Sequence, residues 1–316
     1  MITLSDIRKA QENISPYIKR TPLERSETLS RHLGTNVYIK YELFQKTGSF
    51  KPRGAFNKMM SLTEEQRQKG VVAVSGGNHA QGVAYAAAKL NMEALILMPE
   101  NTPKNYLDAA RNYGAAIELL PTIAAAFAEI ERHRELGRTL VHPFDDELVI
   151  AGQGTVGLEI LEDCPQVTDV FSSIGGGGLA GGVAIAVKSV KPGARVFGVE
   201  TVGADAMAQA IAAGHVVELP AITSIAKTLG APAVTERTLL LVQEYLESVT
   251  VVTDDEAIAS LKFIVERLKV FPEPASSCNL AAAEKLRAEF SPDSHVVIIL
   301  CGGNFSVADL CAYGKG

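Results

Sequence analysis

The sequence contains no tryptophan and only four cysteines, and aromatic residues make up 6% of it. None of the cysteines has the C-x-x-C spacing that is typical of zinc sites and redox pairs. We therefore interpret them as reduced thiols, which indicates a cytoplasmic protein without structural disulfides. The four positions are Cys164, Cys278, Cys301 and Cys311.

Long hydrophobic runs and basic clusters are also missing. No stretch approaches about 18 consecutive apolar residues, so we expect no transmembrane helix and no membrane partner. Residues 1–9 carry charges early and lack an apolar core, so we expect no secretory signal. The formal net charge is −6 without a block of Lys and Arg, which argues against nucleic-acid binding, because phosphate contacts need such clusters.

Short apolar runs alternate with helical segments along most of the 316 residues, which is typical of α/β proteins with parallel sheets and crossover helices. The length suggests about two domains, and 47% hydrophobic residues can form a sizeable core. We predict two open, twisted, mostly parallel sheets flanked by helices. Residues 1–65 and 147–316 would form a large domain, and residues 66–146 a small mobile α/β domain inserted into it. We expect single helices over 123–136, 155–162 and 281–290.

Lys51 stands in the stretch Gly48–Ala55, among small residues, an aromatic residue and a proline. Burial disfavours the charged form of lysine. A neutral lysine amine is a nucleophile that forms Schiff bases with carbonyl groups, including that of pyridoxal phosphate. The alternative is an exposed lysine whose stem packs on Phe50, since most lysines are exposed. This stretch alone does not decide between them.

The stretch Ser75-Gly76-Gly77-Asn78-His79 lies between an apolar strand and an alanine-rich helix. Backbone N–H groups at the start of a helix attract carboxylate or phosphate. A plain strand–helix turn would explain the glycines and the asparagine equally well. Taken alone, His79 is better interpreted as a structural histidine than as an acid or base.

Four consecutive glycines, 175–178, also join a strand to a helix. Glycine lets the backbone approach an anion and turn its N–H groups inward, which predicts a phosphate site. However, Gly176, Gly178 and Gly181 also fit G-x-G-x-x-G, and Glu200 ends the next strand. An NAD-dependent oxidoreductase with a Rossmann site is therefore the alternative from another class.

The last apolar strand ends in Leu300-Cys301-Gly302-Gly303-Asn304, where a polar side chain could reach a bound ring, although a buried thiol in a turn is the simpler interpretation. In order and separation, the motifs at 49–55, 75–79, 175–179 and 301–304 resemble those of the fold-type II pyridoxal-phosphate enzymes. The matching branch is the serine/threonine dehydratase and serine racemase family. The resemblance covers nearly the whole chain and implies a tryptophan synthase β-like fold, with the active site between the lobes.

The resemblance implies a role for each motif. Lys51, beside Phe50, would hold pyridoxal 5'-phosphate (PLP). Its phosphate would lie on Gly175, Gly176, Gly177, Gly178 and Leu179, and its ring beside Asn78, Glu273, Cys301 and Gly302. The substrate would contact Ser75, Gly76, Gly77, Asn78, His79 and Phe144.

The implied activity is that of a PLP-dependent dehydratase, an ammonia-lyase. It would eliminate the β-hydroxyl of a 3-hydroxy amino acid such as L-threonine or L-serine, giving a 2-oxo acid and ammonia. Lys51 would remove the Cα proton, and a neutral Cys301 would leave the ring nitrogen unprotonated, which suits elimination. The alternatives are a dehydratase for substrates of the phenylserine or hydroxyaspartate type, a serine racemase, and a non-catalytic PLP-binding protein. A homodimer is also implied.

Two positions depart from the family. Racemases carry a second serine where this chain has Gly76, so racemisation by two bases is not expected. Some relatives bind a divalent cation through a glutamate, a carbonyl four residues on and an acid six residues on. Here these are Glu200, Ala204 and Ala206, and alanine supplies no side-chain oxygen. Mg²⁺ with additional waters remains compatible, because it needs few protein ligands.

Overall fold

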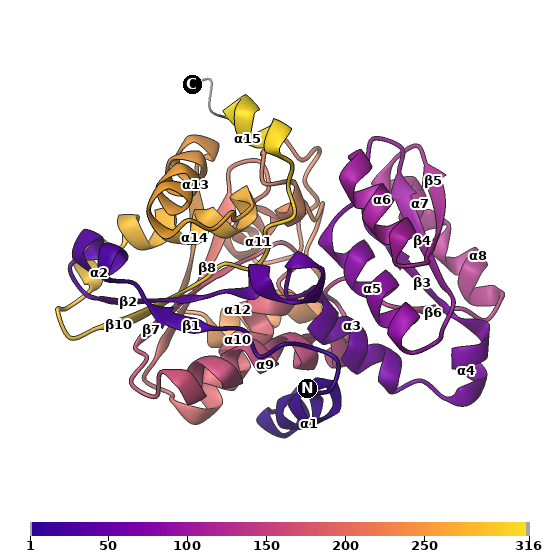
Figure 1. Ribbon diagram of the computed structural model, residues 1–316, viewed down its shortest axis with the longest axis horizontal. Helices are drawn as coiled ribbons and strands as arrows, with labels where there is room; N and C mark the ends of the chain where they lie inside the picture. Colours follow the sequence, from indigo (N-terminus) through magenta and orange to yellow (C-terminus); the bar gives the residue numbers. More distant parts are fainter. Residues whose placement is uncertain (1, 314–316) are drawn as a thin grey trace.

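Two separate sheets organise the chain in the computed structural model, which describes residues 2–313 (Figure 1). The larger sheet has six strands in the order β1-β2-β10-β7-β8-β9, and only the β1–β2 pair is antiparallel. The strands are β1 (Leu23–Arg25), β2 (Asn36–Lys40), β7 (Asp169–Ser173), β8 (Arg195–Thr201), β9 (Ser248–Val252) and β10 (His295–Ile299).

The smaller sheet has four strands, all parallel, in the order β5-β4-β3-β6. They are β3 (Val71–Val74), β4 (Ala94–Pro99), β5 (Ala116–Leu120) and β6 (Thr139–Leu140). Together the two sheets confirm the α/β class with mostly parallel strands. The carboxyl ends of such strands, where the loops to the following helices begin, are the usual place for a binding site.

Both sheets are covered on both faces, because successive side chains of a strand point to opposite sides. In β3, Val71 and Ala73 pack with α5 (Asn78–Lys89) and α3 (Lys51–Met60), whereas Val72 and Val74 pack with α7 and α8. Figure 1 shows α3 and α5 between the two sheets. The remaining helices of the smaller sheet are α6 (Lys104–Asn112), α7 (Ile123–Ala128) and α8 (Ile130–Glu135).

The larger sheet is sandwiched in the same way. In β7 and β8, Val170 and Val196 pack in one core with α9 and α10, whereas Phe171 and Phe197 pack in the opposite core with α13 and α14. The helices of this part are α1 (Leu4–Ile14), α2 (Glu27–Leu33), α9 (Glu147–Asp163), α10 (Gly178–Val190), α11 (Ala206–Ala213), α12 (Glu236–Tyr245), α13 (Asp254–Leu268), α14 (Pro274–Lys285) and α15 (Val307–Tyr313). Helix α4 (Glu64–Lys69) leads into β3 and lies on the side of the smaller sheet (Figure 1).

A buried ionic cluster fixes α3, the helix that begins at Lys51. Arg53 is fully buried and donates two hydrogen bonds to each of Glu42 and Glu159, at 2.7–2.9 Å. Lys40 also donates to Glu159, at 2.5 Å. Burial lowers the pKa of Arg53, but the two carboxylates outweigh burial and leave that pKa raised. The cluster ties α3 to β2 and α9, and so holds the start of α3 in place.

Several element boundaries differ from the sequence-based expectations. The helix expected over 123–136 is interrupted at Glu129 and forms α7 and α8. Helix α9 begins at Glu147 rather than at 155, because the Asp146 side chain accepts from Leu148 N and Val149 N and caps it. Helix α14 spans 274–285 rather than 281–290, since Pro274 suits a first helical turn.

Helix α12 was not anticipated; Thr235 and Thr238 form its capping box. Among the helices of residues 2–313, none combines the length and the apolar character that crossing a bilayer requires.

Candidate active site

Lys51 lies at the carboxyl end of the larger sheet. The Phe50 amide donates to Cys301 O at 3.1 Å, and Ser49 forms a β-bridge with Gly302. The residues just before Lys51 are therefore paired with the segment that follows β10. Helix α3 then starts at Lys51 itself, with Pro52 in its first turn, where the missing N–H is tolerated. This arrangement brings the lysine and the Cys301–Gly302 motif together, although they lie far apart in the sequence.

The amine of Lys51 is held in a restricted environment. Its Nζ donates to Pro143 O at 2.8 Å and lies 5.0 Å from the centre of the Phe50 ring. Burial lowers the pKa of Lys51 to about 8, and the nearby Cys301 and Glu273 only partly oppose that shift. A substantial fraction of this amine is therefore neutral at mildly alkaline pH, unlike that of a surface lysine.

The 75–79 loop connects β3 to the start of α5. Asn78 is buried, and its Nδ2 donates to Glu273 Oε1 at 2.8 Å. Ser75 Oγ accepts from Gly77 N at 3.1 Å and shapes the turn. A Cβ on Gly76 would lie 2.8 Å from Thr102 Oγ1, so the close approach of these two segments requires glycine there. The loop thus brings Asn78, at the start of α5, into contact with Glu273.

His79 lies inside α5 rather than on the loop surface. Its Nε2 donates to Val141 O at 2.8 Å, and its Nδ1 is buried with no partner among residues 2–313. Burial lowers the pKa of His79 to about 3, and the charge of Lys51 adds to that shift. The ring is therefore neutral and has a structural contact, as the sequence analysis favoured.

The tetraglycine turn joins β7 to the N-terminus of α10. Gly177 has φ +92°, a conformation that favours glycine. No residue of 2–313 accepts a hydrogen bond from the amides of Gly175, Gly176 or Gly177. Unpaired amides at the start of a helix, together with the α10 dipole, are suited to an anion. Leu179 is buried in the core beneath the turn.

Phe144 covers the tetraglycine turn. A Cβ on Gly176 would overlap the Phe144 ring, and one on Gly178 would lie 2.9 Å from Phe144 O. The neighbouring residue Pro143 is the one that receives the Lys51 amine. The 143–144 segment therefore bridges the lysine and the turn.

Two further groups complete the site. Cys301 Sγ lies 3.2 Å from Ser276 Oγ, and burial raises the pKa of Cys301 to about 12, so it remains a neutral thiol. Burial also raises the pKa of Glu273 to about 7, although hydrogen bonds from Thr228 and Asn78 oppose that shift. Glu273 Oε2 is buried and has no partner within residues 2–313.

Comparison with known proteins identifies the family of this chain. Residues 14–302 match the family described as "Pyridoxal-phosphate dependent enzyme". The chain belongs to this family. It is 40% identical over 310 residues to an L-threonine ammonia-lyase of Thermotoga maritima, covering 97% of this chain and 77% of the relative.

Solved structures of the family have the same fold. Maize serine racemase superposes with a TM-score of 0.94 at 37% identity, covering 98% of this chain and 96% of the other. A threonine deaminase from T.th. superposes with a TM-score of 0.90 at 38% identity, covering 96% and 99%. The fold that the resemblance implied is confirmed, and the chain is a PLP-dependent enzyme.

The residues present fit PLP. The unpaired amides of the tetraglycine turn suit its phosphate, and the weakly basic amine of Lys51 suits its aldehyde. Glu273 Oε2 is a further buried polar atom without a hydrogen-bond partner among residues 2–313.

The positions implied for a divalent cation do not fit one. Both carboxylate oxygens of Glu200 accept backbone amides, from Met207 N at 2.9 Å and Ala208 N at 2.8 Å. The third position of the motif is Ala206, which has no side-chain oxygen. The start of α11 thus provides the contacts that a cation would otherwise make.

Sequence reasoning gave no individual role to Pro143, Thr228 and His142. Thr228 Oγ1 donates to Glu273 Oε1 at 3.1 Å. His142 Nδ1 accepts from the amide of Asp145 at 2.7 Å, and burial lowers the pKa of His142 to about 4. The motif around His142 could have been used as a signal, but Thr228 lies in an irregular segment without any pattern.

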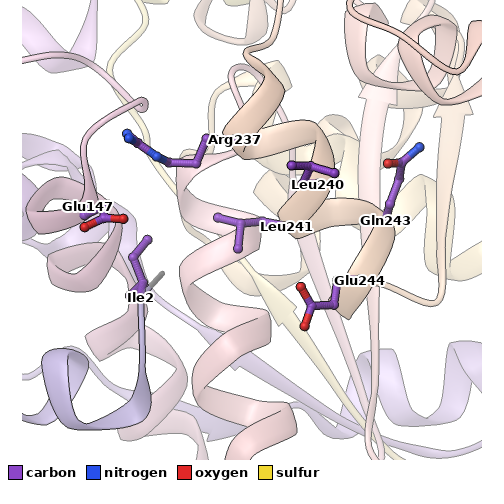
Figure 2. A pocket seen from close by; sticks show the side chains of 7 residues that line it. All are labelled: Ile2, Glu147, Arg237, Leu240, Leu241, Gln243 and Glu244. Atoms are coloured by element: carbon purple, nitrogen blue, oxygen red, sulfur yellow. The ribbon is translucent and has the colours of Figure 1, made fainter.

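A separate surface hollow of about 610 Å³ lies beside α12 and contains none of the residues above. Its lining consists of Ile2, Glu147, Arg237, Leu240, Leu241, Gln243 and Glu244. Figure 2 shows Arg237 and Leu241 projecting from α12 toward the side on which Ile2 and Glu147 lie. Arg237 donates to Asp145 at 2.8 Å, so the guanidinium group that lines this hollow is already paired with a carboxylate. We therefore assign the chemistry to the Lys51 site.

Proposed function

We propose that this enzyme is a dehydratase of the L-threonine and L-serine type, which releases a 2-oxo acid and ammonia. The observation that carries the proposal is the position of Lys51, a weakly basic amine located between the tetraglycine turn, the neutral Cys301 thiol and the Asn78–Glu273 pair. The activities of the threonine ammonia-lyase and threonine deaminase relatives support the same reaction class.

Lys51 both holds the cofactor and moves the proton. When bound, PLP supplies an electron sink that stabilises negative charge at the substrate Cα. Nζ of Lys51, neutral in a substantial fraction because its pKa is about 8, accepts the Cα proton. The hydrogen bond to Pro143 O gives Nζ a fixed direction before substrate binds.

The loop at the start of α5 binds the substrate carboxylate. Its first amides point outward at the positive end of the helix dipole, which favours an anion. Ser75 and Asn78 add polar side chains there. His79 supports the loop from below through Val141 and takes no part in proton transfer.

Cys301 sets the electronic character of the site. A thiol with a pKa near 12 stays neutral and offers no negative charge to a ring nitrogen. Beside this thiol a ring nitrogen would keep no extra proton, which would favour loss of a β-substituent over transamination. Glu273 contributes a buried carboxyl group whose pKa of about 7 lies near neutral pH.

Serine racemisation is the second candidate, because the chain superposes closely on maize serine racemase. Racemisation by two bases needs a proton donor on the face opposite Lys51. Gly76 stands where the racemase motif has serine, and it carries no such group. We therefore place elimination first.

We further propose that residues 66–146 move as a unit over the substrate, and that the enzyme works as a homodimer in the cytoplasm. Closure of such a unit would exclude water from the reacting carbon. Light scattering after gel filtration tests the dimer; a monomeric mass would contradict it.

The decisive assay measures ammonia and 2-oxo acid from L-threonine, L-serine, phenylserine and hydroxyaspartate, with D-serine formation measured in parallel. We expect ammonia from threonine or serine and loss of turnover in Lys51→Ala. Lys58→Ala is the matched control, because Lys58 lies on the same helix and pairs with Asp146 at 2.6 Å. Activity retained by Lys51→Ala, or racemisation without ammonia, would refute the proposal.

A further inference from the structure

Asn304 contacts both sides of the site, although its motif did not predict an individual role for it. Its Nδ2 donates to Asn78 Oδ1 at 2.9 Å and to Thr47 O at 2.6 Å. Its backbone carbonyl accepts the hydroxyl of Tyr106, which lies on α6. Asn78 and Tyr106 both belong to the part of the chain that carries the smaller sheet. Asn304 therefore links that part to the end of β10.

These contacts determine which way the Asn78 amide faces. Thr47 O can only accept, so the NH₂ group of Asn304 must face it, and the second N–H of that group reaches Asn78. Glu273 Oε1 accepts from the other side of Asn78 at 2.8 Å. Rotating the Asn78 amide by half a turn would set its oxygen against Glu273 and its NH₂ against the NH₂ of Asn304. Both contacts would then be repulsive.

The fixed orientation leaves one donor free. Asn78 Nδ2 has two N–H bonds and gives one to Glu273. Nδ2 lies directly over the end of β10, since a Cβ on Gly302 would be 3.0 Å from it. Thr228 supports the arrangement by donating to the same oxygen of Glu273, at 3.1 Å.

We propose that Asn304 is a positioning residue that orients the Asn78 amide so that its remaining N–H serves an anionic oxygen on the cofactor ring. The inference rests on the ring placement proposed above. Asn304 itself touches neither cofactor nor substrate and acts through Asn78. Tyr106 contributes by holding the Asn304 backbone while the smaller sheet lies against the site.

The test uses two substitutions with different chemistry. Asn304→Asp keeps the shape, but its carboxylate cannot donate to Asn78 Oδ1, so the Asn78 amide is driven to turn. Asn304→Leu removes the donor without adding repulsion, and Glu273 still holds Asn78. Asn36→Asp is the matched control, because Asn36 also donates its amide to backbone carbonyls, at Pro292 and Ser294, far along β2 from the site.

We expect PLP affinity, measured by titrating the cofactor-free protein, to fall about 10- to 100-fold in Asn304→Asp, because a hydrogen bond to a charged group is lost. Asn304→Leu should lose less, and Asn36→Asp should match wild type. In Asn304→Asp the bound cofactor should show less of its longer-wavelength band at neutral pH, because an oxygen without its donor retains its proton more strongly. In Asn304→Leu the same change should be smaller, because Glu273 still holds the Asn78 amide.

Three results would overturn the inference. One is an unchanged spectrum with PLP affinity within about fivefold of wild type, because about 1 kcal/mol is the least effect expected of a lost hydrogen bond. Another is Asn304→Leu losing more than Asn304→Asp. The third is a loss of PLP affinity that is proportional to the loss in melting temperature in every variant, including Asn36→Asp. If Asn304→Asp does not fold, the spectrum of Asn304→Leu decides. Ammonia release by the wild-type enzyme is measured alongside, and its absence would count against the proposed function. The PLP affinity and the absorption spectrum of the variants test the role of Asn304 separately.

Discussion

Replacing Lys51 by methionine should stabilise the cofactor-free protein at neutral pH. The Lys51 amine has a pKa of about 8 in the folded chain, against an ordinary value of 10.5, because burial disfavours its charge. Below pH 8 the folded state must therefore keep a charged group in a poorly solvated place. Methionine has a similar length and carries no charge, so the substitution removes this cost.

The magnitude follows from the two pKa values. The difference between 10.5 and about 8 corresponds to roughly 3 kcal/mol at 1.36 kcal/mol per pH unit. The lysine is partly exposed and donates to Pro143 O, so screening and the lost hydrogen bond reduce the gain to about 1–3 kcal/mol. The cost is fully present below pH 8, declines between pH 8 and 10.5, and is gone above 10.5. The advantage of Lys51→Met should decline over the same interval.

Urea unfolding of the two cofactor-free proteins at pH 7, 8.5 and 10 measures this difference. Far-UV circular dichroism is the suitable probe, because the chain has no tryptophan. Comparing variant with wild type at each pH cancels the titration of all other groups. A Lys51→Met protein that is less stable by the same amount at every pH would refute the claim that the amine is held with a lowered pKa.

Two further substitutions test the supports of the site. Arg53→Met leaves the buried Glu42 carboxylate without a cationic partner and Glu159 with Lys40 alone, and should cost about 3–5 kcal/mol in urea unfolding. The half-exposed Arg20→Met should cost under about 1 kcal/mol, and equal losses would contradict a buried cluster. Gly176→Ala forces a Cβ into the Phe144 ring and should weaken PLP binding about tenfold or more. Gly193→Ala is the control, because Gly193 has open space around it and its substitution should leave PLP binding unchanged. Unchanged binding by Gly176→Ala would contradict the assignment of the turn to the phosphate.

The sequence was sufficient for the class of fold and for the family, because both depend on local signals. Alternating apolar runs predict parallel strands, and glycine turns predict helix starts with free amides. The unexpected start of α9 also had a local signal, because Asp146 directly precedes an apolar helix and can cap it.

The rest of the site depends on contacts between distant parts of the chain. Thr228 meets Glu273 across 45 residues, and Asn304 meets Asn78 across 226. No periodicity or spacing records such a meeting, because each partner is ordinary in its own segment. The lowered pKa of Lys51 belongs to the same group, since it depends on burial that only the folded chain creates.

Reduction of the PLP-bound protein with borohydride, followed by peptide mass mapping, tests the central claim most directly. The account predicts that the cofactor becomes fixed to the peptide containing Lys51 and that Lys51→Ala retains no fixed cofactor. Attachment to a different lysine, or no attachment with the visible colour unchanged, would contradict it.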